Sequence, residues 1–284
     1  MRSAVDIILS SFLSRLQAEK QERLLHFLPD NERESIKTLL PLAQTPPIES
    51  NGYEKMLEKV HWSWFLPTLK SYSLPEQSQF LAVLDESAAR ALASEIPCKM
   101  AKIDISVMGR SYLRQVLLDS LLGPHDRLIP IAYLPPSPLN KILNLTKTQL
   151  ITLIDFIAMH DLSVEIRQIV ETKILKKIYS YLSEKQRRFL KLTAAKHEVS
   201  PPPKIGLDRW DGNEDSLRHL LHKKGLSRLG MALSGQDPSL AWYVCHLLDI
   251  GRGSALFKLC EREKNGSSVD TAVRQVEELL EHDL

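Results

Sequence analysis

The sequence has little that would build a β-sheet, a disulfide framework or a membrane span. Only 6% of its 284 residues are aromatic, and we find no sustained alternation of β-branched and polar residues. The three cysteines (Cys98, Cys245, Cys260) are widely spaced without a C-x-x-C pair, which favours buried thiols in a reducing compartment. No apolar run approaches the roughly 18 residues needed to cross a bilayer. A formal net charge of +2 gives no overall field that would favour nucleic acid or a membrane surface.

Glycine is scarce in the first 200 residues, where only Gly52, Gly109 and Gly123 occur. Leucine-rich sequence that is poor in glycine and rich in capping residues is typical of helices. The only short strand candidate is Ile103–Val107, and it could equally be a loop. The sequence therefore predicts an all-α fold.

The N-terminal stretch reads as an amphipathic helix and not as a signal peptide. Val5, Ile8 and Phe12 recur at helical spacing, while Asp6 and Arg15 interrupt the apolar run. No small-residue cleavage site follows. We therefore expect a soluble cytoplasmic protein.

Three stretches have the spacing of a capping box, in which a hydroxyl residue precedes Glu or Gln by three positions. They are Ser73–Glu76, Thr146–Gln149 and Ser183–Gln186, and each predicts a helix start. The run Leu150–Leu162 is apolar on most faces, so we expect it to form a central buried helix.

Prolines and polar linkers divide the predicted helices into units. Residues 44–50 read as a linker, and three consecutive prolines in Ser200–Pro203 exclude a continuous helix. In the first unit we expect one helix to about Phe27 and a second from Asp30 through Leu40. The predicted units are residues 1–43, 51–130, 131–199 and a separate C-terminal module, 204–284.

The stretch Gly225–Leu259 predicts two short helices joined by a tight turn and followed by a third helix. Gly235 should end the first helix in the left-handed conformation. Asp237 and Pro238 should begin the second, as N-cap and first helical residue. The repeat spacing along the chain is irregular, which favours an irregular stack of short helices over a regular solenoid.

None of the motifs that would indicate metal binding, nucleotide binding or catalysis has the residues at the spacing that its chemistry requires. His219, His222, Cys245 and His246 lack the Glu of H-E-x-x-H and any paired cysteines, so we expect surface histidines and no zinc. The sequence contains no P-loop, dinucleotide glycine fingerprint or G-x-S-x-G. We therefore expect no cofactor and no enzyme activity.

Two acidic motifs have structural explanations. Asp211–Asp215 begins like a calcium loop, but Ser216 and His222 stand at positions six and twelve, so a capping turn is favoured. His160 and Asp161 lie in the apolar run, where a core histidine is favoured over a general base.

Basic residues dominate Lys173–Lys196, with Glu184 as the only acid. This segment could be a solvated helix face, a site for an acidic protein partner, or a nucleic-acid site. Its basic residues are Lys173, Lys176, Lys177, Lys185, Arg187, Arg188, Lys191 and Lys196.

One part of the chain resembles a known family. The order Leu229-x-x-Ala232-Leu233-x-Gly235, a short helix to Leu248 and a turn to Ala255-Leu256 is similar to helical units of the flagellar rotor switch protein (FliG-like). Leu74–Gln77 and Leu182–Lys185 look like helix starts of that family's middle region. The whole chain also resembles a cytoplasmic sorting-platform component of a bacterial type III secretion apparatus.

The resemblance implies an armadillo-like or FliG-like right-handed array and a non-enzymatic adaptor that binds other subunits of such an assembly. It also implies that the chain reaches the inner face of the membrane only through these partners. The charged torque helix of the rotor family is not found, so torque generation is not expected. Aromatics and arginine supply much interface energy, so Trp242, Tyr243 and Arg252 are candidate contact residues, with core packing as the alternative for the two aromatics.

The exposed basic segment adds four further candidates, Lys176, Lys177, Arg187 and Arg188. The alternative function is a helical-array nucleic-acid binder that uses the 173–196 face. A third hypothesis is an enzyme whose site is assembled from distant residues.

Overall fold

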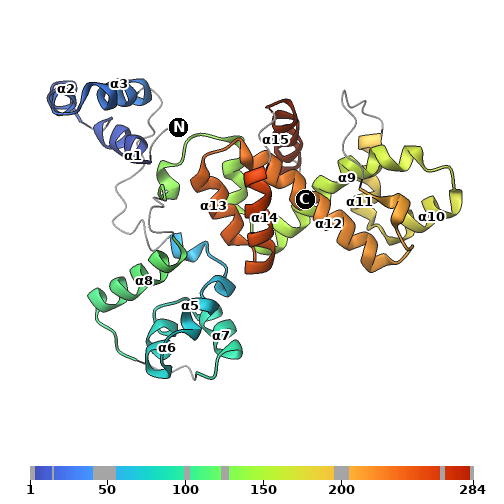
Figure 1. The fold of residues 1–284 in the computed structure, drawn as a ribbon, viewed down its shortest axis with the longest axis horizontal. Coiled ribbons are helices and arrows are strands. Elements are labelled where there is room, and N and C mark those ends of the chain that lie inside the picture. Colours follow the sequence, from blue (N-terminus) through green and yellow to red (C-terminus); the bar gives the residue numbers. More distant parts are fainter. Residues whose placement is uncertain are drawn as a thin grey trace. The chain divides into compact units, whose positions relative to one another are not determined.

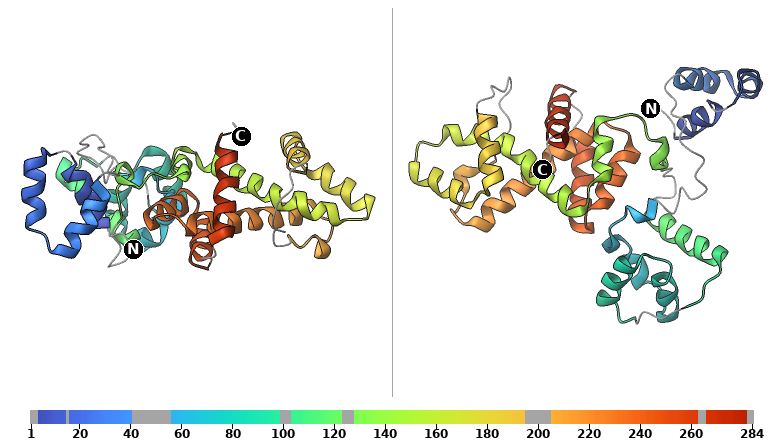
Figure 2. Two further views of the ribbon diagram at one scale, coloured as in Figure 1. Left: turned by 90° about the horizontal axis from the view of Figure 1, so that it is seen from above. Right: turned by 180° about the vertical axis from the view of Figure 1, so that it is seen from behind.

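Only helices are found as regular elements in the computed structural model (Figures 1 and 2), which describes residues 4–14, 16–40, 56–98, 103–122, 128–194, 205–262 and 266–281. No strand occurs among these residues, so the all-α prediction is confirmed. Residues 103–106, part of the strand candidate, have no regular structure, and Val107 begins a helix. None of the described helices is both long and apolar enough for a bilayer span.

The chain divides into two compact units, Met1–Pro136 and Ser137–Leu284. The elements of the first unit are α1 (Ala4–Leu13), α2 (Ala18–His26), α3 (Asp30–Leu39), η2 (Trp62–Trp64), α5 (Leu66–Lys70), α6 (Leu74–Leu81), α7 (Glu86–Glu95), α8 (Val107–Leu121) and η3 (Ile131–Tyr133). Leu13, Leu25 and Ile36 form a small core between α1, α2 and α3. The helix expected to run to Phe27 is broken in two, and the side chain of Gln21 donates to the carbonyl of Leu13 at the break.

The elements of the second unit are η4 (Pro138–Asn144), α9 (Lys147–Glu165), η5 (Ile166–Gln168), α10 (Thr172–Tyr181), α11 (Glu184–Ala194), η6 (Leu207–Arg209), α12 (Glu214–Ser234), α13 (Pro238–Leu247), α14 (Ile250–Arg262) and α15 (Gly266–Glu281). As predicted, α9 is the central buried helix, and it contacts α11, α12 and α15. The two longest helices of the unit, α9 and α12, lie side by side (Figures 1 and 2).

All three predicted capping boxes are present. The Ser73 backbone N–H donates to the Glu76 carboxylate at 2.8 Å, at the start of α6. The same bond is found at the start of α9, where the Thr146 N–H donates to the Gln149 side chain at 2.9 Å. It is also found at the start of α11, where the Ser183 N–H donates to the Gln186 side chain at 2.9 Å. These starts depend on residues three positions apart, which explains why the sequence alone predicts them.

A glycine allows α12 to approach α9 closely. A Cβ placed on Gly225 would lie 1.9 Å from the carbonyl oxygen of Ile154 on α9. Any larger residue would overlap the α9 backbone, so this helix crossing requires glycine.

The division of the chain falls after Pro136 and not at the Ser200–Pro203 break, which lies outside the described residues. Residues 204–284 do not form a separate module, because α12 and α15 pack on α9. The Glu165 carboxylate at the end of α9 accepts the backbone N–H of Leu207 at 2.8 Å and of Gly206 at 3.1 Å. It also accepts the N–H of Ile205. These bonds join the segment that follows the proline break to α9.

The turn between α12 and α13 differs from the prediction in one respect. Gly235 has φ −90° and ψ 0°, which is right-handed and not left-handed. Close packing explains the glycine instead, because a Cβ there would lie 2.6 Å from Cγ1 of Val269 on α15. Asp237 caps α13 as predicted, and its carboxylate accepts the Ser239 N–H at 2.8 Å.

Candidate functional site

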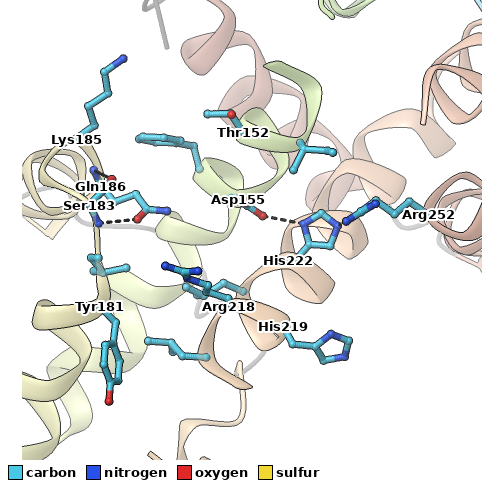
Figure 3. Close-up of a pocket in the computed structure, with 15 residues that line it drawn as sticks. Thr152, Asp155, Tyr181, Ser183, Lys185, Gln186, Arg218, His219, His222 and Arg252 are labelled. Carbon is cyan, nitrogen blue, oxygen red and sulfur yellow. Dashed lines mark hydrogen bonds and ion pairs between the residues drawn. The ribbon is translucent and has the colours of Figure 1, made fainter. Parts of the chain in front are cut away.

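A hollow of about 730 Å³ opens in the second unit between α9, α11 and α12 (Figure 3). The sides of α9 and α12 that face it, together with the turn before α11, supply its lining. Its apolar lining residues are Ile151, Phe156, Leu182, Leu217 and Leu221. Arg252 reaches it from α14. The hollow therefore combines residues that are distant in sequence.

A chain of polar contacts crosses one wall of the hollow (Figure 3). The Asp155 carboxylate lies 2.8 Å from Nδ1 of His222, and Arg252 Nε donates to Nε2 of the same ring at 3.2 Å. Because Nε2 accepts from Arg252, Nδ1 carries the proton and donates it to Asp155. Both ring nitrogens of His222 are thus engaged, which leaves neither free to act as a base.

Arg252 is held in place by a second carboxylate. Its Nη1 donates to Asp249 Oδ2 at 2.6 Å, and its backbone N–H donates to Oδ1 at 3.2 Å. Partial burial opposes ionisation of Asp249, but the bonds from Arg252 and the charges of Arg252 and Lys147 outweigh it and lower the pKa of Asp249 to about 2. Arg252, a predicted contact residue, is therefore a fixed charge at the edge of the hollow.

The hydroxyl groups that line the hollow are engaged in local structure. Ser183 Oγ accepts the N–H of Gln186 at 3.2 Å, and Thr152 Oγ1 donates to the carbonyl of Thr148 at 3.0 Å. The Tyr181 hydroxyl donates to the carbonyl of Gly212 at 3.4 Å. Nucleophilic catalysis needs a hydroxyl or thiol within hydrogen-bond reach of a base. Each of these three hydroxyls therefore takes part in a local structural contact.

Cationic side chains outnumber acidic ones around the hollow. Lys185, Arg218 and Arg252 line it, against the single carboxylate of Asp155. Arg218 pairs with Glu214 one turn away, and its side chain is 67% exposed. Over the described part of the chain, no three His, Cys, Asp or Glu side chains converge into a metal site.

Two predicted contact residues belong to the core instead. Tyr243 is fully buried and Trp242 is 7% exposed, so neither side chain can reach a partner from the folded unit. The Trp242 ring stacks on His246 with 3.7 Å between ring centroids. Burial raises the pKa of the Tyr243 hydroxyl well above its ordinary value and lowers that of His246 to about 4.

The basic candidates on α10 and α11 are exposed. Lys176, Lys177, Arg187 and Arg188 all face solvent. Arg188 pairs with Glu184, and Arg187 Nε donates to the carbonyl of Leu182 at 2.8 Å. Lys196 of the same segment lies outside the described residues. The four candidate cations are therefore accessible to a partner.

The two acidic motifs have the structural roles expected of them. Asn213 caps α12, and the Asp211 carboxylate accepts the Asn213 N–H at 2.9 Å and the Ser216 hydroxyl. His160 is a core residue whose ring meets Phe189 edge-on at 5.2 Å between centroids. Asp161 pairs with Arg228 of α12, a partner that no sequence motif indicates.

The first two turns of α8 expose three large apolar side chains that the sequence analysis did not single out. Val107, Met108 and Tyr112 are 88%, 84% and 67% exposed. Met108 and Tyr112 are four residues apart and share a helix face. The rest of α8 is anchored, because Arg114 Nε donates to the carbonyl of Val83 at 3.0 Å and Leu117 and Leu118 are buried.

Comparison with known proteins gives no relative. No protein-family model, curated protein or solved structure matches the chain.

Proposed function

We propose that the chain is a non-enzymatic structural adaptor that binds other protein subunits through exposed helix faces. The assembly we propose is a type III secretion or flagellar switch-like complex, since Gly225–Leu259 resembles the FliG-like helical units. In this proposal the chain is cytoplasmic and meets the membrane only through its partners. The helical array would serve as a scaffold and its uncovered surfaces as contacts.

The observation that carries the adaptor proposal is the apolar start of α8. Val107, Met108 and Tyr112 expose large apolar side chains within six residues on a helix that is otherwise anchored by buried leucines. Single exposed apolar residues are common, but contiguous ones on a soluble surface mark interaction sites. Aromatic residues and methionine are also enriched at protein interfaces.

The test is recovery of partners by a tagged chain from its native cell. Met108→Glu and Tyr112→Glu should each lower recovery of subunits about tenfold or more, because a carboxylate would be buried in the interface. Ser94→Glu is the matched control, since Ser94 is an exposed polar residue of α7, outside the apolar start of α8. Equal recovery by all four proteins, or recovery of proteins outside such an assembly, would contradict the adaptor proposal.

The exposed cations of α10 and α11 support nucleic-acid binding as the second candidate function. Binding through phosphates must weaken steeply as salt concentration rises. A labelled single-stranded oligonucleotide should then bind at low salt and be released by Lys176→Glu combined with Lys177→Glu. Absence of binding at low salt would remove this alternative.

A further inference from the structure

We propose that the hollow between α9, α11 and α12 is the docking site for an acidic segment of a partner protein, which inserts an apolar side chain. The site deepens the adaptor function proposed above and rests on it. The apolar residues at the bottom of the hollow (its floor) and the charged residues around its opening (its rim) indicate which kind of molecule it binds.

The floor of the hollow suits an apolar side chain. Phe156 on α9, Leu182 before α11 and Leu217 on α12 are buried residues that still contribute surface to it. Its volume of about 730 Å³ lies within the range of roughly 300–1,000 Å³ typical of binding pockets. An anchor residue in such a pocket supplies most of the energy of many protein interfaces.

The rim of the hollow suits carboxylates. Lys185 has no ion-pair partner among the described residues, and the pair that Arg218 makes with Glu214 is exposed to solvent. In Figure 3 the Arg218 side chain extends from α12 towards the space between Gln186 and Asp155. Arginine binds carboxylates with two parallel hydrogen bonds, which a planar partner group can use. The one lining acid, Asp155, is already occupied by His222.

This arrangement fits a peptide better than a nucleic acid. Nucleic-acid grooves combine an extended cationic track with aromatic rings on which bases stack. Here the cations surround one apolar hollow, and Asp155 lies within it. A phosphate backbone would meet that carboxylate, whereas an acidic peptide can place its apolar anchor there and its charges at the rim.

The experiment selects peptides from a random display library against the full chain and measures the affinity of a synthetic selected peptide by fluorescence anisotropy. We expect selected sequences in which Asp or Glu flanks a large apolar residue. Thr152→Glu places a carboxylate in the hollow, and Arg218→Glu reverses the rim charge. Each variant should weaken binding of the selected peptide about tenfold or more.

The matched control is Thr148→Glu, one turn earlier on α9, exposed and outside the hollow. It should leave the affinity unchanged, and circular dichroism of each variant checks that the fold is retained. Selection of peptides without acidic residues, equal affinity for wild type and both hollow variants, or displacement of the peptide by an oligonucleotide overturns the docking proposal.

The same variants separate this proposal from the adaptor function. If Thr152→Glu and Arg218→Glu still recover subunits that Met108→Glu loses, the adaptor function stands and the hollow is not its docking site. If the peptide binds as expected but no subunit of a secretion or switch-like assembly is recovered, the docking site stands and the adaptor function fails.

Discussion

Asp161 on α9 and Arg228 on α12 form a buried ion pair between residues that are 67 positions apart in the sequence. Arg228 Nε donates to both carboxylate oxygens, at 3.0 and 3.1 Å. Lys224 Nζ lies 3.7 Å from the same carboxylate. Burial lowers the pKa of Lys224, and the charge of Asp161 opposes that shift. The pair therefore joins α12 to α9 through a buried, charged contact.

Arg228→Met should destabilise the protein strongly. Removing one partner of a buried pair leaves the other charge uncompensated, at a cost of about 3–5 kcal/mol. We expect the lower end of that range, because Lys224 remains close to Asp161. The free energy of unfolding in urea measures the change.

Replacing both partners tests whether an uncompensated buried charge causes the loss of stability. Asp161→Leu combined with Arg228→Met removes both charges of the pair and should restore part of the lost stability, because Lys224 then lacks its nearby carboxylate. Arg188→Met breaks an exposed pair with Glu184 and is the matched control, expected to cost less than about 1 kcal/mol. A loss for Arg228→Met no larger than that of the control would show that the buried pair contributes little.

Gly225→Ala should destabilise the protein although alanine favours helix. The added Cβ would lie 1.9 Å from the carbonyl oxygen of Ile154, and a backbone atom cannot move aside as a side chain can. We expect a loss of at least about 2 kcal/mol, since overpacking outweighs a propensity gain of about 1 kcal/mol.

Gly251→Ala on α14 is the control for this substitution. Its Cβ would meet only Asp249 Oδ1 at 3.4 Å, an ordinary contact, on an exposed helix surface. Thermal unfolding should show an unchanged or slightly raised midpoint for Gly251→Ala and a clearly lowered one for Gly225→Ala. Equal midpoints for the two variants would mean that α12 can shift away from α9.

The sequence predicts those parts of the fold that depend on near neighbours. The capping boxes at Ser73, Thr146 and Ser183 and the burial of α9 follow from residues within one or two helical turns. The packing of α12 on α9 depends on Arg228 and Gly225, whose partners are far away in sequence and leave no periodic signal. For the same reason the boundary predicted between residues 199 and 204 is not where the chain divides.

The candidate site was predicted less well than the fold, for a physical reason. Aromatic residues are enriched both in cores and at interfaces, so the residue types of Trp242 and Tyr243 could not distinguish the two. Arg252 does line the hollow, but its partner His222 was expected only as a surface residue. The exposure of Met108 and Tyr112 depends on where α8 is anchored, which no local pattern indicates.

His246 should make the protein less stable as the pH falls below 6.5. Burial lowers its pKa from 6.5 to about 4, so the unfolded chain binds the proton first on acidification. The contribution of the neutral ring is complete above pH 6.5 and is lost as the pH falls to about 4. It amounts to about 3 kcal/mol at most.

His246→Gln should flatten the pH dependence of the unfolding free energy in this window, while His219→Gln, at an exposed histidine, should not. If the unfolding free energy fell with the same slope below pH 6.5 in His246→Gln and in the wild type, the buried ring would not be the source of this pH dependence.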